Sequence, residues 1–126
     1  MTGTHDLARV ICRLADLADP GARAFVCGAG DWPLRGFVVR RAGEVFAYLN
    51  RCPHRNHALN WHPERFLTPD GRMILCASHG AVFEISSGAC LGGPCRGVGL
   101  TALDVTVERG YVMLAEDPDE LAARYA

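Results

Sequence analysis

Cys52-Pro53-His54 and, after residues 55–75, Cys76-Ala77-Ser78-His79-Gly80 are the two motifs from which the architecture of this chain can be predicted. Each motif offers one thiol and one imidazole, the side chains that soft and borderline metal ions prefer. Pro and Gly punctuate both motifs and indicate loops, where Cys and His are poor candidates for passive core filling. The two loops together are therefore predicted to hold a metal centre that neither loop could hold alone.

Mixed Cys and His ligation suits a [2Fe-2S] cluster whose thiolates bind one iron and whose imidazoles bind the other. Two thiolates neutralise the formal charge of two ferric ions and two sulfides, whereas four thiolates would leave the oxidised cluster negative. An added electron meets less repulsion at a neutral centre, so this ligation raises the reduction potential. The second ring nitrogen of each imidazole can titrate, which couples electron uptake to proton uptake. Such a centre is a one-electron carrier.

Two other interpretations of the same residues remain open. Two Cys and two His also make a tetrahedral zinc site, in a structural or regulatory module, although zinc fingers usually pair Cys with Cys and His with His along the chain. The four residues could also be unligated. A colourless protein with one equivalent of zinc would support the zinc alternative.

The order of the motifs resembles the signature of the Rieske 2Fe-2S family, and the following Gly88-Ala89-Cys90-Leu91-Gly92-Gly93-Pro94 resembles the loop that covers the cluster there. The resemblance extends from about Cys12 to Ala115. It implies one Rieske-type 2Fe-2S cluster per chain. The implied ligands, which bind both the cofactor and its metal, are Cys52, His54, Cys76 and His79, with the thiolates on the inner iron and the imidazoles pointing outward.

Departures from the family pattern indicate a subtype. The respiratory members resemble this chain at the ligands but carry an extra disulfide-bonded Cys in each loop, where this chain has His57 and Ser78. They also place Ser and Tyr hydroxyls where this chain has Ala81 and Phe83. Fewer donors to the sulfurs stabilise the reduced cluster less, which predicts a potential of about −100 mV, at the low end of the Rieske range.

The remaining pattern resembles the soluble Rieske ferredoxins that carry electrons from a flavin reductase to a terminal oxygenase. The oxygenases share the Rieske domain but need a second, much larger iron-binding domain, for which 126 residues are too few. We therefore expect an electron-transfer protein, a component of an oxidoreductase system rather than an enzyme, with redox proteins as partners. A small subunit of a multicomponent reductase or oxygenase is the neighbouring alternative.

Composition is consistent with this expectation. With 126 residues and 49% hydrophobic residues, the chain suits one domain over 1–126, with a cluster-binding subdomain at about 50–96. The net charge of −1 argues against nucleic-acid binding. No apolar run is long enough for a membrane span and the N-terminus lacks a signal-peptide pattern, so we expect a cytoplasmic protein.

Charge is unevenly distributed along the chain. Residues 51–96 contain three acidic residues, Glu64, Asp70 and Glu84, and five arginines, namely Arg51, Arg55, Arg65, Arg72 and Arg96. This excess favours an acidic docking face on a redox partner, because complementary charge steers encounter. Ordinary solvated loop charges are the alternative interpretation.

Short β-branched and aromatic runs separated by Gly and Pro predict an all-β fold, a Rieske-like antiparallel sandwich or barrel. Strands are expected at 8–14, 23–27, 34–40, 45–50, 72–75, 81–85, 100–107 and 111–115. Asp117-Pro118-Asp119-Glu120 has the pattern of a capped helix start, and predicts a short C-terminal helix at about 117–126 in which Leu121 and Tyr125 pack on the barrel.

Other reactive residues are given no role as ligands. Cys12 and Cys27 lie in apolar runs and are expected to be small buried hydrophobes. Cys90 and Cys95 flank the glycine loop and are predicted to remain thiols. The insert at 60–71 either faces a partner through Trp61 or His62, or is a surface loop held down by Trp61 and Phe66.

Overall fold

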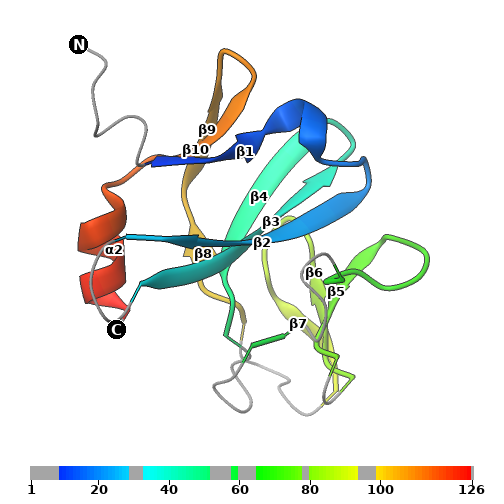
Figure 1. The fold of residues 1–126 in the computed structure, drawn as a ribbon. Helices are drawn as coiled ribbons and strands as arrows, with labels where there is room; N and C mark the ends of the chain where they lie inside the picture. Colours follow the sequence, from blue (N-terminus) through cyan, green and yellow to red (C-terminus); the bar gives the residue numbers. More distant parts are fainter. Residues whose placement is uncertain are drawn as a thin grey trace.

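A computed structural model describes residues 9–28, 33–51, 58–59, 65–77, 80–93 and 99–125 of the chain. These residues form three antiparallel sheets and one short C-terminal helix (Figure 1), which confirms the predicted fold class. The central sheet has the order β2-β3-β4-β8, with β2 at Gly21–Cys27, β3 at Leu34–Arg41, β4 at Glu44–Leu49 and β8 at Ala102–Leu103.

Two smaller sheets complete the architecture. The first has the order β1-β10-β9, with β1 at Val10–Arg13, β10 at Tyr111–Leu114 and β9 at Val105–Glu108. The second has the order β5-β6-β7, with β5 at Met73–Leu75, β6 at Val82–Glu84 and β7 at Cys90–Gly92. A 3-10 turn, η1 at Leu14–Asp16, follows β1.

The central sheet packs against a core on each face. Successive side chains of a strand point to opposite sides, so one strand can supply residues to both cores. Along β3, Phe37 and Val39 enter one core while Val38, between them, enters the other. The first, here called the site-side core, lies against β5-β6-β7 and contains Cys76. The second, the helix-side core, lies against β1-β10-β9 and the helix α2, Pro118–Arg124.

Helix α2 starts and packs as its sequence predicts. The Asp117 carboxylate caps it by accepting a hydrogen bond from the Asp119 N–H at 2.8 Å, and Pro118 occupies the first helical position. Leu121 is buried in the helix-side core and Tyr125 packs against it. No helix among the described residues is long and apolar enough to cross a membrane.

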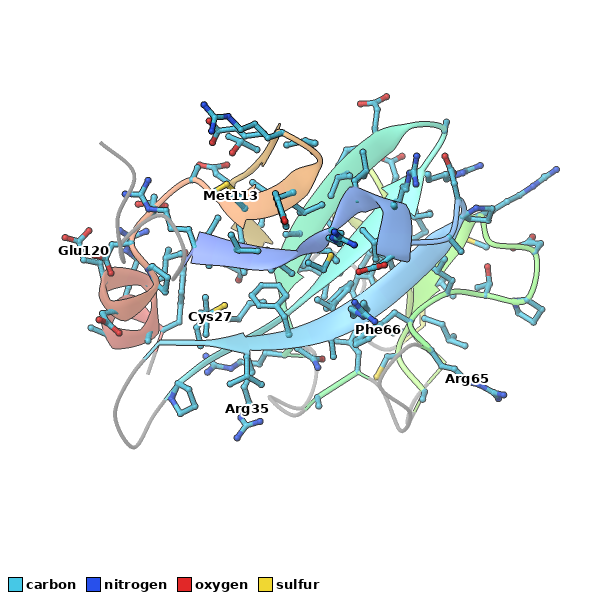
Figure 2. The ribbon with its side chains drawn as sticks, turned by 45° about the horizontal axis from the view of Figure 1, so that its top comes forward. Cys27, Arg35, Arg65, Phe66, Met113 and Glu120 are labelled. Atoms are coloured by element: carbon cyan, nitrogen blue, oxygen red, sulfur yellow. The ribbon has the colours of Figure 1, made fainter. Side chains whose placement is uncertain are left out.

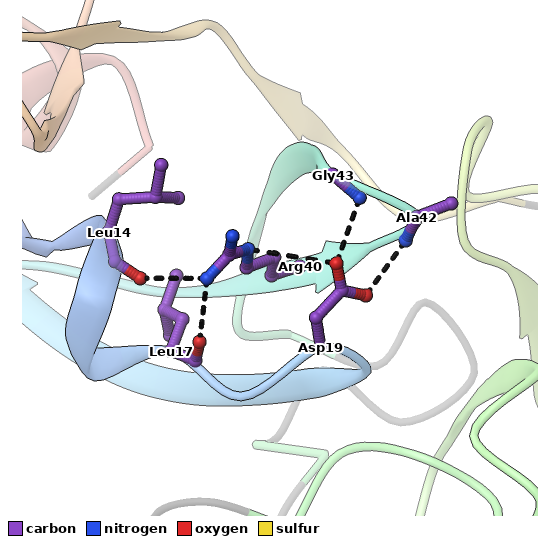
Figure 3. Close-up of polar contacts among 6 residues, drawn as sticks. All are labelled: Leu14, Leu17, Asp19, Arg40, Ala42 and Gly43. Atoms are coloured by element: carbon purple, nitrogen blue, oxygen red, sulfur yellow. Dashed lines mark hydrogen bonds and ion pairs between the residues drawn. The ribbon is translucent and has the colours of Figure 1, made fainter.

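A polar anchor ties the chain before β2 to the β3–β4 turn (Figure 3). The Asp19 carboxylate accepts hydrogen bonds from the N–H groups of Ala42 and Gly43 at 2.8 and 2.9 Å. The Arg40 guanidinium donates to the carbonyl oxygens of Leu14 and Leu17 at 3.2 and 3.0 Å. This anchor is at the opposite end of β3 and β4 from the predicted ligand loops.

The structure corrects three expectations about strands. The segment 100–107 is not one strand, because β8 pairs with β4 and β9 pairs with β10, so the chain crosses between sheets at Asp104. This crossing explains why the apolar residues Leu100, Ala102, Leu103, Val105 and Val107 do not keep one alternation along the segment. Residues 90–92, expected to be loop, form β7, and Leu14, expected in the first strand, belongs to η1.

Candidate metal centre

Cys76 is the one predicted ligand among the described residues, and it lies directly after β5 in the β5–β6 connection. Its N–H donates to the Ala81 carbonyl at 2.8 Å, and its own carbonyl accepts from the Gly80 N–H at 3.0 Å. Gly80 has a positive φ of 71°, a conformation that L side chains rarely adopt. This positive φ explains why a Gly stands at position 80, at the end of the second motif.

The other predicted ligands, Cys52, His54 and His79, lie outside the described residues. The same is true of His57, Ser78 and Cys95, and of Trp61 and His62 in the insert. The structure therefore shows how the ends of the two ligand loops are held, and the ligand set itself stays a prediction.

A chain of hydrogen bonds joins the two loops. Asn50 directly follows β4, and its side-chain oxygen accepts from the Leu59 N–H at 2.9 Å. Leu59, on the return from the first loop, accepts from the Ala77 N–H in the second loop at 2.8 Å. Residues that flank the two motifs, which are more than twenty positions apart, are thereby held together.

The start of the glycine loop lies against the residues that follow the second ligand loop. Gly92 of β7 pairs with Val82 of β6, and Gly93 follows with a φ of 93°. A Cβ on Gly93 would lie 2.8 Å from the Ala81 Cα, closer than real side chains come. Only Gly fits this contact at position 93, whereas a Cβ on Gly92 would meet nothing closer than Val82 at 3.5 Å.

Apolar side chains surround Cys76. The fully buried members of its core include Leu59, Phe66, Ala81 and Phe83, and no polar or charged residue among those described is buried. Phe66 stacks on Phe37 with ring centroids 4.4 Å apart. Phe66, in the insert at 60–71, therefore belongs to the site-side core.

A buried tyrosine connects this core to the far turn of the β5-β6-β7 sheet. The Tyr48 hydroxyl on β4 donates to the Ile85 carbonyl at 2.5 Å. Burial, and secondly the negative charge of Glu84, raise the pKa of Tyr48 to about 12. The hydroxyl therefore stays protonated and remains a donor at ordinary pH.

The other described cysteines, Cys12, Cys27 and Cys90, are not expected to be ligands. Cys12 is buried and Cys27 is half-buried in the helix-side core, and burial raises the pKa of both thiols. The Cys90 thiol donates to the Gly92 carbonyl at 3.4 Å within its own strand. Among the described residues no group of three or more His, Cys, Asp and Glu side chains could hold a metal.

Sequence reasoning missed Asn50 and Tyr48. Neither has a local signal, because their partners Leu59 and Ile85 follow 9 and 37 positions later. A polar residue that ends an apolar strand just before a ligand motif, as in Leu49-Asn50-Arg51-Cys52, is the only hint that the sequence contains.

The donor chemistry fits an iron-sulfur cluster. A buried cysteine lies in an apolar core, and the two motif loops are predicted to bring a second Cys and two His to it. Thiolate ligands in such surroundings are typical of clusters that are protected from solvent.

Comparisons with known proteins agree with this chemistry. The model of the Rieske [2Fe-2S] domain family matches residues 8–107. No curated protein matches the chain. Among solved structures, the Sphingomonas yanoikuyae B1 ferredoxin is 28% identical, with a TM-score of 0.64 over 85% of this chain and 96% of that chain.

Two further structures come from one kind of enzyme system. A chain of the complex of reduced oxygenase and oxidized ferredoxin in carbazole 1,9a-dioxygenase is 28% identical, with a TM-score of 0.67, and covers 84% of this chain and 99% of that one. The ferredoxin of carbazole 1,9a-dioxygenase from Nocardioides aromaticivorans IC177 is 24% identical, with a TM-score of 0.68 over 86% of this chain and 96% of that chain, and shows the fold alone.

Proposed function

The chain belongs to the Rieske [2Fe-2S] domain family, and from that premise we propose that it carries single electrons to an oxygenase as a ferredoxin-type protein. The observation on which the proposal depends most is the family match over residues 8–107. The ferredoxin structures that match nearly from end to end support the carrier role over that of a whole oxygenase.

The cofactor is a Rieske 2Fe-2S cluster, and we propose Cys52, His54, Cys76 and His79 as its ligands. The cluster, when bound, supplies a site that accepts and releases one electron. The chain's own residues hold the loops: Asn50 and Leu59 tie the first loop to the second, and the apolar core around Cys76 excludes water from the thiolate side.

Partners follow from the neighbours by analogy. The solved complex of oxygenase and ferredoxin supports a terminal oxygenase as acceptor. A flavin reductase as donor and the cytoplasm as compartment complete the proposal, both from the resemblance to ferredoxins.

Electron paramagnetic resonance of the dithionite-reduced protein tests the proposal. We expect a rhombic signal with an average g below 2, and about two irons and two sulfides per chain. Cys76→Ser and Cys52→Ser should lose the signal, whereas Cys27→Ser, half-buried in the other core, should keep it. A protein that stays silent after anaerobic reconstitution, with one zinc bound, would overturn the cluster assignment.

A further inference from the structure

Charge is segregated between the end of the molecule that carries the ligand loops and the rest. We define the site end as residues 33–36, 49–51, 58–59, 65–67, 75–77, 80–83 and 90–93, the described segments that flank the ligand and glycine loops. Its charged residues are Arg35, Arg51 and Arg65, with no Asp or Glu. All three are exposed.

The remaining described residues have the opposite balance. They include eleven Asp and Glu residues but only eight Arg residues. The acids are Asp16, Asp19, Glu44, Asp70, Glu84, Asp104, Glu108, Glu116, Asp117, Asp119 and Glu120, and the arginines are Arg9, Arg13, Arg23, Arg40, Arg41, Arg72, Arg109 and Arg124. A chain with a net charge of −1 thus places only positive charge on its described site end.

Backbone contacts place the three arginines around the site. Arg51 immediately precedes Cys52, and the Arg35 carbonyl accepts from the Asn50 N–H at 3.0 Å. Arg65 precedes Phe66, whose carbonyl accepts from the N–H of Leu75, the residue before Cys76. Figure 2 shows Arg35 and Arg65 pointing away from the ribbon on the side opposite to Met113.

A hydrogen bond to the C-terminal residues holds Arg51 in place. The Arg51 guanidinium donates to the carbonyl of Tyr125, just past the C-terminal end of α2, at 2.9 Å. The acidic first turn of α2 lies at the other end of that helix, where Pro118 and Asp119 approach Gly28.

One exposed apolar side chain belongs to the site end, and another lies next to it. Leu91 on β7 is 52% exposed, two residues before the Gly93 that contacts Ala81. Val26 is 56% exposed and lies opposite Arg35 in the β2–β3 register. A surface that combines arginines with exposed apolar side chains resembles the composition of protein interfaces, where Arg is enriched and Asp and Glu are depleted.

From this distribution we propose that the site end, Arg35, Arg51, Arg65 and Leu91, is a docking surface for a redox protein whose own electron-transfer face is acidic. The inference rests on the proposed electron-carrier function. Opposite charge accelerates encounter and orients the partner, while Leu91 supplies apolar contact once the surfaces meet. A cluster held by the ligand loops would give up one electron to an oxidised redox centre of the partner, with no covalent bond formed or broken.

Two protein probes of opposite charge test the surface without the natural partner. The reduced, cluster-loaded protein is mixed in a stopped-flow instrument with an acidic plastocyanin or with a basic cytochrome c, over ionic strengths from about 10 mM to about 500 mM. The plastocyanin rate should fall with added salt, and the cytochrome c rate should rise. Comparing salt dependences removes the difference in driving force between the probes.

A matched pair of variants locates the charge. Arg35→Gln/Arg65→Gln removes two charges from the site end, and Arg13→Gln/Arg109→Gln removes two exposed charges from the β1 and β9–β10 region. At about 10 mM ionic strength the first variant should slow reduction of plastocyanin by about threefold to tenfold, and the second should change it by less than about twofold.

The outcomes separate the surface from the function. The docking surface would be overturned if the rate of plastocyanin reduction did not depend on ionic strength, or if both double variants lost the same fraction of that rate. Either result would leave the carrier function intact. Absence of the rhombic resonance signal in the starting protein would instead overturn the carrier function. Retention of that signal in both variants shows that the substitutions leave the cluster in place.

Discussion

Asn50 and Leu59 show how single residues assemble this site. The carboxamide of Asn50 holds the return of the first ligand loop, and the carbonyl of Leu59 holds the start of the second. Leu59 is fully buried, so a missing acceptor for its N–H would leave a donor shielded from water. A buried donor without a partner costs about 1–3 kcal/mol.

Asn50→Ala should therefore lower the free energy of unfolding by about 1–3 kcal/mol and reduce the iron and sulfide retained per chain. Asn50→Asp keeps an acceptor oxygen and should retain more cluster than the Ala variant. Thr106→Ala, which removes an exposed hydroxyl on β9 that bonds Glu108 at 3.2 Å, is the control. Equal iron retention in Asn50→Ala and Thr106→Ala would contradict the role of Asn50.

Phe83 and Ala81 are expected to lower the reduction potential of the cluster. Both are fully buried in the core that contains Cys76, and neither can donate a hydrogen bond from its side chain. Hydrogen bonds to the sulfurs favour the reduced, more negative state and raise the potential.

Phe83→Tyr should raise the midpoint potential measured by protein-film voltammetry. A new bond worth about 1 kcal/mol more in the reduced state corresponds to roughly 40 mV for one electron. Phe46→Tyr, a half-buried residue of β4 that packs against the same core, should change the potential far less. An unchanged potential in Phe83→Tyr, or a wild-type midpoint above about +100 mV, would contradict the expectation of a low-potential site.

At the scale of elements, glycines control how closely the loops approach one another. Gly93 combines a positive φ with the contact to Ala81, whereas Gly110 in the β9–β10 turn has a φ of 82° and no atom within 4 Å of an added Cβ. The two residues therefore separate backbone strain from steric clash.

Gly93→Ala should destabilise the protein more than Gly110→Ala and should also release iron, because the Ala81 backbone must move. Gly110→Ala should cost about 1 kcal/mol from backbone strain alone and leave the cluster content unchanged. Thermal unfolding and iron analysis of both variants measure the difference. Similar losses of stability, with full iron in both, would show that the glycine loop yields without disturbing the site.

Tyr48 links two elements through a buried hydroxyl. Since its pKa is raised from 10.0 to about 12, the folded state holds the phenol proton more tightly than the unfolded state does. The resulting stability is fully present below pH 10, and it is lost as the pH rises from 10 towards 12. Two units correspond to about 3 kcal/mol.

Tyr48→Phe should lower the free energy of unfolding at pH 8 by about 1–3 kcal/mol, because the Ile85 carbonyl loses its donor. The difference from the wild type should shrink between pH 10 and 12, as measured by urea unfolding at each pH. Tyr111→Phe, 40% exposed on β10, should follow the wild type throughout. A constant difference between wild type and Tyr48→Phe across that range would contradict the assignment.

The whole molecule consists of a central sheet between two cores. Sheet β2-β3-β4-β8 contributes side chains to both, whereas β5, β6 and β7 have three residues each and border only the site-side core. Short strands of this kind are marginal by themselves. A cluster that links the ligand loops would supply the missing stability to that sheet.

Removal of the cluster should therefore raise hydrogen exchange unevenly. Amides of β5, β6 and β7 and of Leu59 and Ala77 should exchange faster in the apoprotein, while β2 and β3 should stay protected. Hydrogen-exchange mass spectrometry of the holo and apo forms measures this. A uniform increase over all sheets would show that the molecule unfolds as one unit without its cluster.

Most of the strands could be predicted from the sequence, because alternation and Gly or Pro punctuation are local signals. The prediction was wrong where pairing is non-local. The crossing at Asp104 and the formation of β7 depend on which other strands the chain pairs with. A run as short as Cys90-Leu91-Gly92 has too little periodicity to indicate such pairing. The core position of Phe66 likewise depends on its contact with Phe37, far away in the chain.

The sequence by itself determined the family and its chemistry, since ligand type and spacing are properties of neighbouring residues: Cys52-Pro53-His54 and Cys76-Ala77-Ser78-His79 are complete as written. Only the tertiary structure decided which groups join the loops, which glycine must remain Gly and that Arg35 lies beside the Arg-rich segment 51–96. Asn50, Gly93 and Arg35 obtain their significance from partners distant along the chain, and spatial proximity between such residues arises only when the chain folds.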